Sequence, residues 1–413
     1  MADRRRLSGR GATARRLAPF VAAALVPAGV ATATAMAEAE AASGGPPAAT
    51  AEAVPGASAL AMRELAPGVW VHEGAQAEPD ADNLGDVANI GFVIGGDCVA
   101  VIDGGASLAV GRALRAALRT RTALPVCHRI ATHMHPDHVL GLAAFDGTGP
   151  QQRDPTMVGH ARLAAALGQR STGYRAAMQR EIGAAGASPE PPLPGRTVDP
   201  QAPLLLALGE QTLHLQAHPP AHTDNDLSVW LPAAGVLWTG DLLFHQRVPA
   251  LDGRLRGWQA WTGAQRARDC GVDGPHAAGG PQGAGASPHW IVPGHGPVLR
   301  HDGRPDSPWC TALGAQAAYL DGLAQTVRSA LDAGLSLGDL LRREGAEGAP
   351  PAKDTSAKDT SAQGRSGQDR PARPATGTGG PGPAQASGAV GWALYALYHR
   401  RNLSAAWAEL EWE

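Results

Sequence analysis

The stretch Ala131-Thr-His-Met-His-Pro-Asp-His-Val139 decides how this chain of 413 residues is organised. It places three histidines and one aspartate within six positions, at His133, His135, Asp137 and His138. His133 and His135 stand two residues apart, so in extended backbone their side chains point the same way and can hold one metal ion. Asp137 and His138 lie past a proline turn and can face a second ion. The pattern predicts a metal site rather than a histidine-rich surface loop.

Apolar residues on either side of this stretch predict an α/β fold. Residues 126–131 are expected to form a short buried strand, and residues 139–145 the start of a helix. A strand end that leads into a helix N-terminus is where α/β folds place their chemistry. Strands and a helix before it are expected over 68–72, 90–94, 98–102 and 108–121. This alternation predicts helices layered on sheets.

The residues that follow give further expectations. A helix is predicted over 159–182, a Pro/Gly-rich loop over 184–203 that could act as a flap over the site, and a hairpin over 204–216. A lone histidine in a strand or loop is usually structural or exposed. We therefore leave five histidines out of the site: His160, His214, His218, His276 and His289.

The H-x-H-x-D-H string at 133–138 resembles the signature of the metallo-β-lactamase superfamily. That resemblance implies a four-layer αββα sandwich and three more metal ligands, each at a strand end. The chain has candidates in the expected order, namely His222, Asp241 and His295. The implied first ion is held by His133, His135 and His222. The implied second ion is held by Asp137, His138 and His295, with Asp241 bridging both.

Two other aspartates are candidates for orienting the ligand histidines. Asp103 ends the predicted strand at 98–102, where the superfamily resemblance implies a carboxylate that accepts from an imidazole N–H. A turn residue before two glycines is the equal alternative for Asp103. Asp224 follows His222 closely and is expected to orient that ligand or contact substrate, with helix capping as the simpler alternative.

The expected cofactors are two Zn²⁺ ions, with iron or manganese also compatible with these ligands. Two such ions lower the pKa of a bridging water from near 16 to about 7. The resulting hydroxide is expected to attack an ester, thioester or lactone carbonyl of a small molecule, with Asp137 and Asp241 as the catalytic carboxylates. Aspartate instead of cysteine at position 241 argues against β-lactam hydrolysis. The ligand set is also compatible with an iron-dependent oxygenase or a non-catalytic metal-binding accessory protein.

A closer resemblance is to the quinoprotein relay system zinc metallohydrolases, which are periplasmic members of the superfamily. It runs from about residue 65 to 309 and returns near 390. The residues that carry it are 222–229, 240–244, 247–253, Gly257-Trp258 and 400–406. The resemblance implies that the protein is an accessory to a periplasmic quinoprotein dehydrogenase system.

The first residues have the order of an export signal. Arg4-Arg-Arg6 and Arg15-Arg16 precede the apolar run 17–26, and small residues follow up to Ala35-Met-Ala37. Residues 1–37 are therefore predicted to be a signal peptide of the Sec or twin-arginine type. A disordered tail or a retained anchor is the alternative. The mature protein is expected in the periplasm or outside the cell, without a membrane anchor, because no later segment is long and apolar enough to span a bilayer.

Composition predicts the division of the remaining chain. Residues 38–62 are expected to be a flexible linker and 63–343 the hydrolase domain, with a low-complexity loop at 271–288. Residues 344–388 contain Lys-Asp-Thr-Ser-Ala twice and too few apolar side chains to fold, which predicts a disordered insert. Residues 389–413 are expected to form a C-terminal helix that docks back on the domain.

Charge and cysteine content narrow the functional classes. The formal net charge of −3 provides no basic field for nucleic acid, which disfavours a nuclease. The four cysteines are Cys98, Cys127, Cys270 and Cys310. In an exported protein they permit two disulfides in three connectivities. Buried thiols are the alternative for Cys98 and Cys127.

Overall fold

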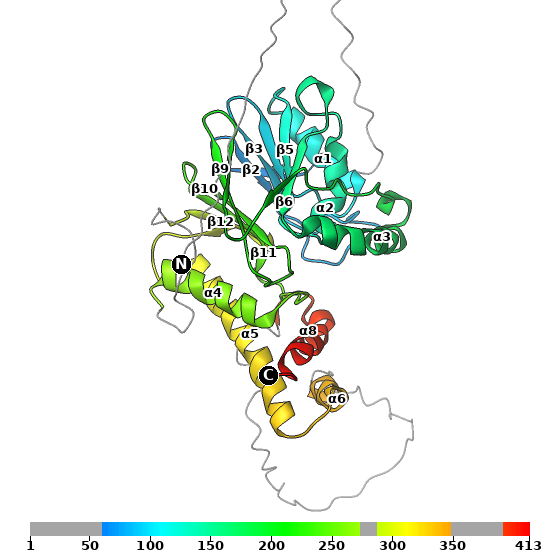
Figure 1. The fold of residues 1–413 in the computed structure, drawn as a ribbon, viewed down its shortest axis with the longest axis vertical. Helices are drawn as coiled ribbons and strands as arrows, with labels where there is room; N and C mark the ends of the chain where they lie inside the picture. The colour runs from blue at the N-terminus through cyan, green and yellow to red at the C-terminus, as the bar shows by residue number, and fades with distance from the viewer. Residues whose placement is uncertain (1–59, 273–286, 348–390) are drawn as a thin grey trace, which may run out of the picture. The chain divides into compact units, whose positions relative to one another are not determined.

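The apolar runs pair into two β-sheets (Figure 1). The structure, a computed structural model, describes residues 60–272, 287–347 and 391–413. In these residues the first sheet has seven strands in the order β1 to β7, and the second has six in the order β13-β12-β11-β10-β9-β8. The first sheet consists of β1 (Met62–Ala66), β2 (Val69–His72), β3 (Ile90–Ile94), β4 (Val99–Ile102), β5 (Val126–Ile130), β6 (Thr156–His160) and β7 (Arg196–Val198). The second consists of β8 (Leu204–Ala207), β9 (Thr212–Ala217), β10 (Leu227–Leu231), β11 (Val236–Phe244), β12 (Trp290–His295) and β13 (Leu299–Arg300).

The helices cover the outer faces of both sheets. The helices packed on the first sheet are α1 (Leu108–Arg119), α2 (Pro136–Val139) and α3 (Leu163–Ile182). The helices on the side of the second sheet are α4 (Leu255–Cys270), α5 (Pro308–Asp332), α6 (Leu337–Glu347) and α8 (Tyr395–Leu410). A third apolar cluster joins the inner faces of the two sheets, because alternate strand residues such as Val71, Ile102, Leu215 and Val229 point inward. The predicted four-layer αββα sandwich is confirmed.

The helix predicted to reach residue 182 is confirmed as α3, but its expected start and the expected flap were wrong. Residues 156–160, which include the start of the predicted helix, form strand β6, whose Met157 and Val158 are buried between its neighbours. The loop at 184–203 contains β7, which pairs with β6 in parallel and closes the edge of the sheet. This pairing uses the backbone that a free flap would leave open to solvent. The hairpin of β8 and β9 is confirmed.

The C-terminal helix docks on the domain, as expected, through its apolar face. Leu403, Trp407 and Leu410 are buried in the cluster that α4 and α5 share, whereas Leu397 is 38% exposed. The carboxylate of Glu409 accepts hydrogen bonds from the backbone of Leu255 and Arg256, at the start of α4. This carboxylate lies at a helix N-terminus, where free N–H groups favour negative charge. Figure 1 shows α8 beside α5.

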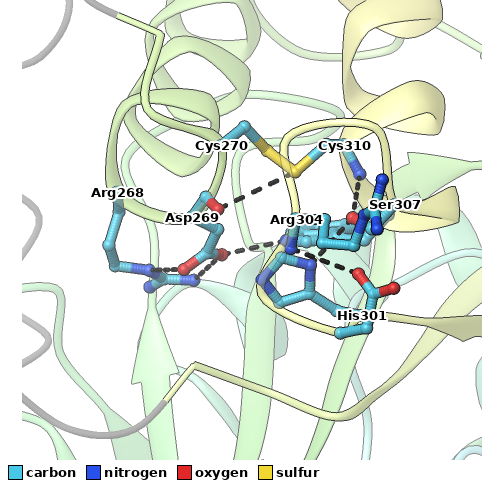
Figure 2. Close-up of a disulfide and its surroundings, with 9 residues drawn as sticks. Arg268, Asp269, Cys270, His301, Arg304, Ser307 and Cys310 are labelled. Atoms are coloured by element: carbon cyan, nitrogen blue, oxygen red, sulfur yellow. Dashed lines mark hydrogen bonds and ion pairs between the residues drawn. A yellow bond between two sulfur atoms is a disulfide. The ribbon is translucent and has the colours of Figure 1, made fainter.

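The four cysteines form two disulfides, Cys98–Cys127 and Cys270–Cys310. The first links the residues around β4 and β5, so the alternative of buried thiols was wrong. The second ties the end of α4 to the start of α5, as Figure 2 shows. Next to it, the buried carboxylate of Asp269 accepts from the indole N–H of Trp309 at 2.9 Å. Each disulfide therefore fixes neighbouring elements of one layer.

Several predicted segments lie wholly or mostly outside the described residues. The predicted signal peptide at 1–37 lies wholly outside them. Of the predicted linker at 38–62, the loop at 271–288 and the insert at 344–388, residues 38–59, 273–286 and 348–388 lie outside them. Within the described part, no helix combines the length and apolar character needed to span a membrane.

Candidate metal centre

The fold brings together all seven residues that the sequence suggested as ligands. One group consists of His133, His135, His222 and Asp241, and the other of Asp137, His138 and His295. Within each group the candidate donor atoms lie within 4.8 Å of one another. The residues come from the loop after β5, the start of α2, the connection between β9 and β10, strand β11 and the end of β12.

Asp103 anchors the loop that carries the H-x-H-x-D-H string. Its Oδ1 accepts from the backbone N–H of Thr132, and its Oδ2 accepts from the Thr132 hydroxyl and from His138 Nδ1, each at 2.8 Å. The hydroxyl of Thr132 lies 3.1 Å from His133 Nδ1, and because its own proton goes to Asp103 it accepts from that nitrogen. Asp103 has a φ of 56°, in the left-handed region that aspartate tolerates better than most residues. It therefore orients two of the histidines.

Backbone carbonyls orient two others. His222 Nδ1 lies 2.6 Å from the carbonyl of Ala250, and His295 Nδ1 lies 2.7 Å from the carbonyl of Val87. A carbonyl only accepts, so each Nδ1 carries the proton and each Nε2 keeps its lone pair. The lone pair of each ring points to the centre.

His135 is oriented by a carboxylate that the sequence analysis did not identify as a site residue. Its Nε2 lies 3.0 Å from Asp252 Oδ2, which also accepts from Arg170. Burial alone would raise the pKa of Asp252, but His135 and Arg170 outweigh it and lower the pKa to about 2. With Asp252 ionised, His135 donates through Nε2 and turns Nδ1 inward. Asp252 falls in the segment 247–253, which carried the closer family resemblance but gave no sign of this contact.

The inward nitrogens and carboxylates face one another without hydrogen-bond donors between them. His135 Nδ1 and His222 Nε2, both bearing lone pairs, lie 3.0 Å apart. Among the described residues, His133 Nε2, His138 Nε2 and Asp241 Oδ1 are buried without a hydrogen-bond partner. Buried polar atoms in native proteins are normally satisfied. Divalent cations satisfy such a set of neutral imidazoles and carboxylates, so the residues present fit a metal centre.

Asp241 occupies the middle of the cluster. One of its carboxylate oxygens lies 3.1 Å from His138 Nε2, and the other lies 3.3 Å from His222 Nε2 and 3.4 Å from His295 Nε2. The neighbouring Gly294 is required here, because a Cβ at that position would lie 1.8 Å from Asp241 Oδ1. Asp241 thus stands between the two groups.

Burial and charge set the protonation of the cluster. Burial lowers the pKa of His222 to about 3 and that of His133 well below its usual value. Burial would raise the pKa of Asp241, but the imidazoles of His295, His138 and His133 outweigh it and hold that pKa well below the usual range. The carboxylate is therefore ionised, and His133 and His222 are neutral, which are the forms that bind metals. His138 differs, because burial would lower its pKa but the carboxylates of Asp241, Asp103 and Asp137 outweigh burial and raise that pKa well above its usual value.

Asn402 of α8 holds the loop that orients His135 and His222. Its amide nitrogen donates to the carbonyl of Pro249 at 2.6 Å, and its oxygen accepts from the backbone N–H of Leu251 at 2.9 Å. These two residues flank Ala250, whose carbonyl accepts from His222, and the same loop ends in Asp252. Asn402 is fully buried, with 1% exposure. The end of the chain thus supports the first metal group.

The structure does not place Asp224 against a ligand histidine. Its carboxylate pairs with Arg162 at 2.6 Å and accepts from the side chain of Asn225. It is Asp226 that binds the hydroxyl and backbone N–H of Thr223, in a turn beside His222. The orienting role expected of Asp224 is therefore wrong, because His222 is oriented by the carbonyl of Ala250.

A cavity of about 390 Å³ opens onto the centre. Asp137, Asp241, His135 and His295 line its floor. Its walls come from four segments: the loop between β2 and β3 contributes Glu78, Pro79 and Val87, α3 contributes Arg170, Tyr174 and Met178, the loop after β11 contributes Arg247, Ala250, Leu251 and Asp252, and α8 contributes Tyr398, Arg401 and Asn402. Residues 184–203 contribute none, so α3 takes the place that we expected a flap to occupy. A cavity of this size holds a small molecule.

Comparison with known proteins agrees with this geometry. A family model described as the metallo-beta-lactamase superfamily matches residues 84–303. Among curated sequences, none matches this chain.

Solved structures share the fold at low sequence identity. The chain is similar to a metallo-beta-lactamase from Pontibacter korlensis, with 18% identity, a TM-score of 0.45, and coverage of 63% of this chain and 99% of that one. It is also similar to the stereoselective inverting sec-alkylsulfatase Pisa1 from Pseudomonas sp., with 14% identity and a TM-score of 0.53. That match covers 85% of this chain and 50% of the sulfatase, and it shows a shared fold.

Proposed function

Because the chain belongs to the metallo-beta-lactamase superfamily and is a metal-dependent hydrolase, we propose that it uses two Zn²⁺ ions to hydrolyse a small-molecule ester, thioester or lactone. One observation carries this proposal. Each of the five clustered histidines donates one ring N–H outward and turns its other nitrogen toward the carboxylates of Asp137 and Asp241. Such outward partners are the usual support of metal-binding histidines.

The proposed division of ligands follows the two groups. His133, His135 and His222 would hold the first ion, and Asp137, His138 and His295 the second. Asp241 would bridge them, because its two oxygens face histidines of both groups. A bridging carboxylate is a hard oxygen ligand, unlike the cysteine of β-lactam hydrolases, and this favours hydrolysis of oxygen esters, thioesters or lactones.

When bound, the two ions would lower the pKa of a water between them and polarise the substrate carbonyl. Asp137 is the acidic ligand that faces the cavity, since its side chain is 15% exposed and that of Asp241 only 3%. An Asp137 carboxylate oxygen can therefore accept the proton of the attacking water and return it to the leaving group. Phe244 and Leu251 line the cavity with apolar surface and exclude bulk water from this transfer.

We also propose that the protein is exported and acts beside a periplasmic quinoprotein dehydrogenase system. The two disulfides support export, because disulfides persist in oxidising compartments. The segments 247–253 and 400–406, which carry the closer family resemblance, contact each other through Asn402 next to the proposed ligands. The closer family resemblance is therefore carried by residues that surround the candidate metal centre.

Metal analysis combined with a substrate panel tests this function. The purified mature protein is expected to contain about two zinc ions per chain and to hydrolyse members of an ester, thioester or lactone panel. Chelation should abolish the activity and zinc should restore it. His289→Ala is a matched control, because His289 is an exposed histidine outside the centre. Turnover of β-lactams alone, or oxygen consumption by an iron-loaded protein, would overturn the assignment.

A further inference from the structure

The cavity above the centre is lined by arginines that metal binding does not require. Three arginines line it, together with four carboxylates, those of Glu78, Asp137, Asp241 and Asp252. With the two proposed divalent cations bound, the positive charge of the ions and the three guanidinium groups would outweigh the four carboxylates. A cavity with this balance attracts a negatively charged molecule.

Two of the three arginines are already paired within the protein. Arg170 binds the carboxylate of Asp252, and Arg247 lies 3.5 Å from Glu78 and donates to the carbonyl of Ala77. Each of these guanidinium groups is held by the wall in which it lies, and its charge is largely offset there. Arg170 and Arg247 therefore stabilise the cavity walls and do not indicate which molecule the cavity binds.

Arg401 differs from these two. Among the residues that the structure describes, it forms no ion pair, and its contact is with the ring of Tyr398, whose centroid lies 5.3 Å from the guanidinium carbon. Tyr398 is fixed in turn, because its hydroxyl donates to Glu78 at 3.0 Å. Stacking on an aromatic ring orients a guanidinium and leaves its N–H donors free.

The helix that carries Arg401 is fixed against the site. Tyr398, Arg401 and Asn402 are three and four residues apart on α8, so they share the face that lines the cavity. Asn402 is hydrogen-bonded to the loop that orients His222 and His135. The side chain of Arg401 is exposed, and the backbone that carries it is held by the same contact that supports the ligands.

We propose that Arg401 binds an anionic group of the substrate, so that the enzyme prefers an acyl chain that ends in a carboxylate over a neutral one. This inference rests on the proposed hydrolase function and names its substrate class. A planar guanidinium with free donors matches a carboxylate in a bidentate pair. Residue 401 lies beyond the residues 84–303 that match the family model, so this specificity belongs to the C-terminal helix.

A matched pair of esters tests the preference. Mono-4-nitrophenyl glutarate and 4-nitrophenyl valerate have acyl chains of equal carbon number and differ in a terminal carboxylate or methyl group. The wild-type enzyme should show the higher kcat/KM for the glutarate. Arg401→Gln should lower the ratio of the two kcat/KM values by about tenfold, and Arg401→Lys should recover part of it. Arg400→Gln, an exposed arginine of the same helix outside the cavity lining, is the control.

Binding measured without turnover separates this inference from the proposed function. Calorimetry of the zinc-loaded protein should show glutarate binding more tightly than valerate, and Arg401→Gln should remove about tenfold of that difference. If neither ester is hydrolysed but the difference in binding persists, the ester function fails and the anion site stands. Equal binding of the two acids, or an equal difference in wild type and Arg401→Gln, would overturn the role of Arg401.

Discussion

The two metal groups are held by different parts of the chain. In the second group, His138 is oriented by Asp103 and His295 by the carbonyl of Val87, both from segments that precede the metal string. In the first group, His135 and His222 are oriented by the loop that ends in Asp252, and that loop is held by the C-terminal helix. The second group is thus oriented mainly by the N-terminal half of the chain, although Arg247 also lies 3.2 Å from His295 Nδ1, and the first group depends on the end of the chain.

This difference shows that candidate ligands close in sequence can be oriented by residues from separate parts of the chain. His135 and His138 are three residues apart, but their orienting carboxylates, Asp252 and Asp103, come from opposite halves of the protein. Changes in the C-terminal helix should therefore affect one ion and leave the other. His133 is the exception in its group, because it is linked through Thr132 to Asp103.

Asp241→Asn should have the largest effect, because it removes the shared negative charge from both groups. We expect the bound zinc to fall well below the wild-type content and hydrolysis to fall by at least about a thousandfold. Elemental analysis and steady-state kinetics measure the two quantities, with circular dichroism to verify folding. Full activity at a low zinc content would contradict the bridging role.

Asp103→Asn should act directly on the second group, through His138, and more weakly on the first, through Thr132 and His133. The amide nitrogen cannot accept a hydrogen bond, so one of the donors on Thr132 or His138 would lose its acceptor. Loss of such an orienting partner costs roughly 10–100-fold in metal affinity or activity. Zinc titration monitored by native mass spectrometry should show one site weakened more than the other. Equal weakening of both sites would indicate that the two groups share one support.

Asn402→Ala should weaken the first group by a smaller factor, because it acts through the backbone of the loop. It removes the contacts to Pro249 and Leu251, so the carbonyl of Ala250 becomes less well placed for His222. We expect a loss of about tenfold in affinity at one zinc site. Ser404→Ala, on the same helix with only a bond to the preceding turn, is the matched control. Weaker zinc binding at the second group instead of the first would contradict the assignment of the C-terminal helix to the first group.

Replacing both Cys270 and Cys310 by serine should leave both groups in place. The bridge closes a loop of 40 residues between α4 and α5, so its removal should lower the free energy of unfolding by about 3 kcal/mol. Denaturant unfolding measures this loss. Zinc stoichiometry should not change, and a loss of zinc would show that general destabilisation can mimic the effect of Asn402→Ala.

The four candidate ligands at 133–138 could be predicted from their local spacing, and the family resemblance implied the other three. His133, His135, Asp137 and His138 are close in the chain, and His222, Asp241 and His295 stand at the ends or within apolar runs that indicate strands. The layered fold followed from the same runs, because their lengths and spacing are those of strands alternating with helices.

The supports of the ligands could not be predicted, because their partners are far apart in the chain. His135 and Asp252 are separated by 117 positions, and Asn402 is 151 positions from Leu251. No spacing rule joins such residues. Asp224 follows His222 closely in sequence, and only the structure shows that its carboxylate pairs with Arg162 instead. Strand β7 has three residues, too few for a periodic pattern.

Anomalous diffraction at the zinc edge tests the central claim most directly. Crystals of the zinc-loaded protein should give two peaks, one among His133, His135 and His222 and one among Asp137, His138 and His295, with Asp241 contacting both. A single peak, or peaks away from Asp241, would contradict the two-ion centre.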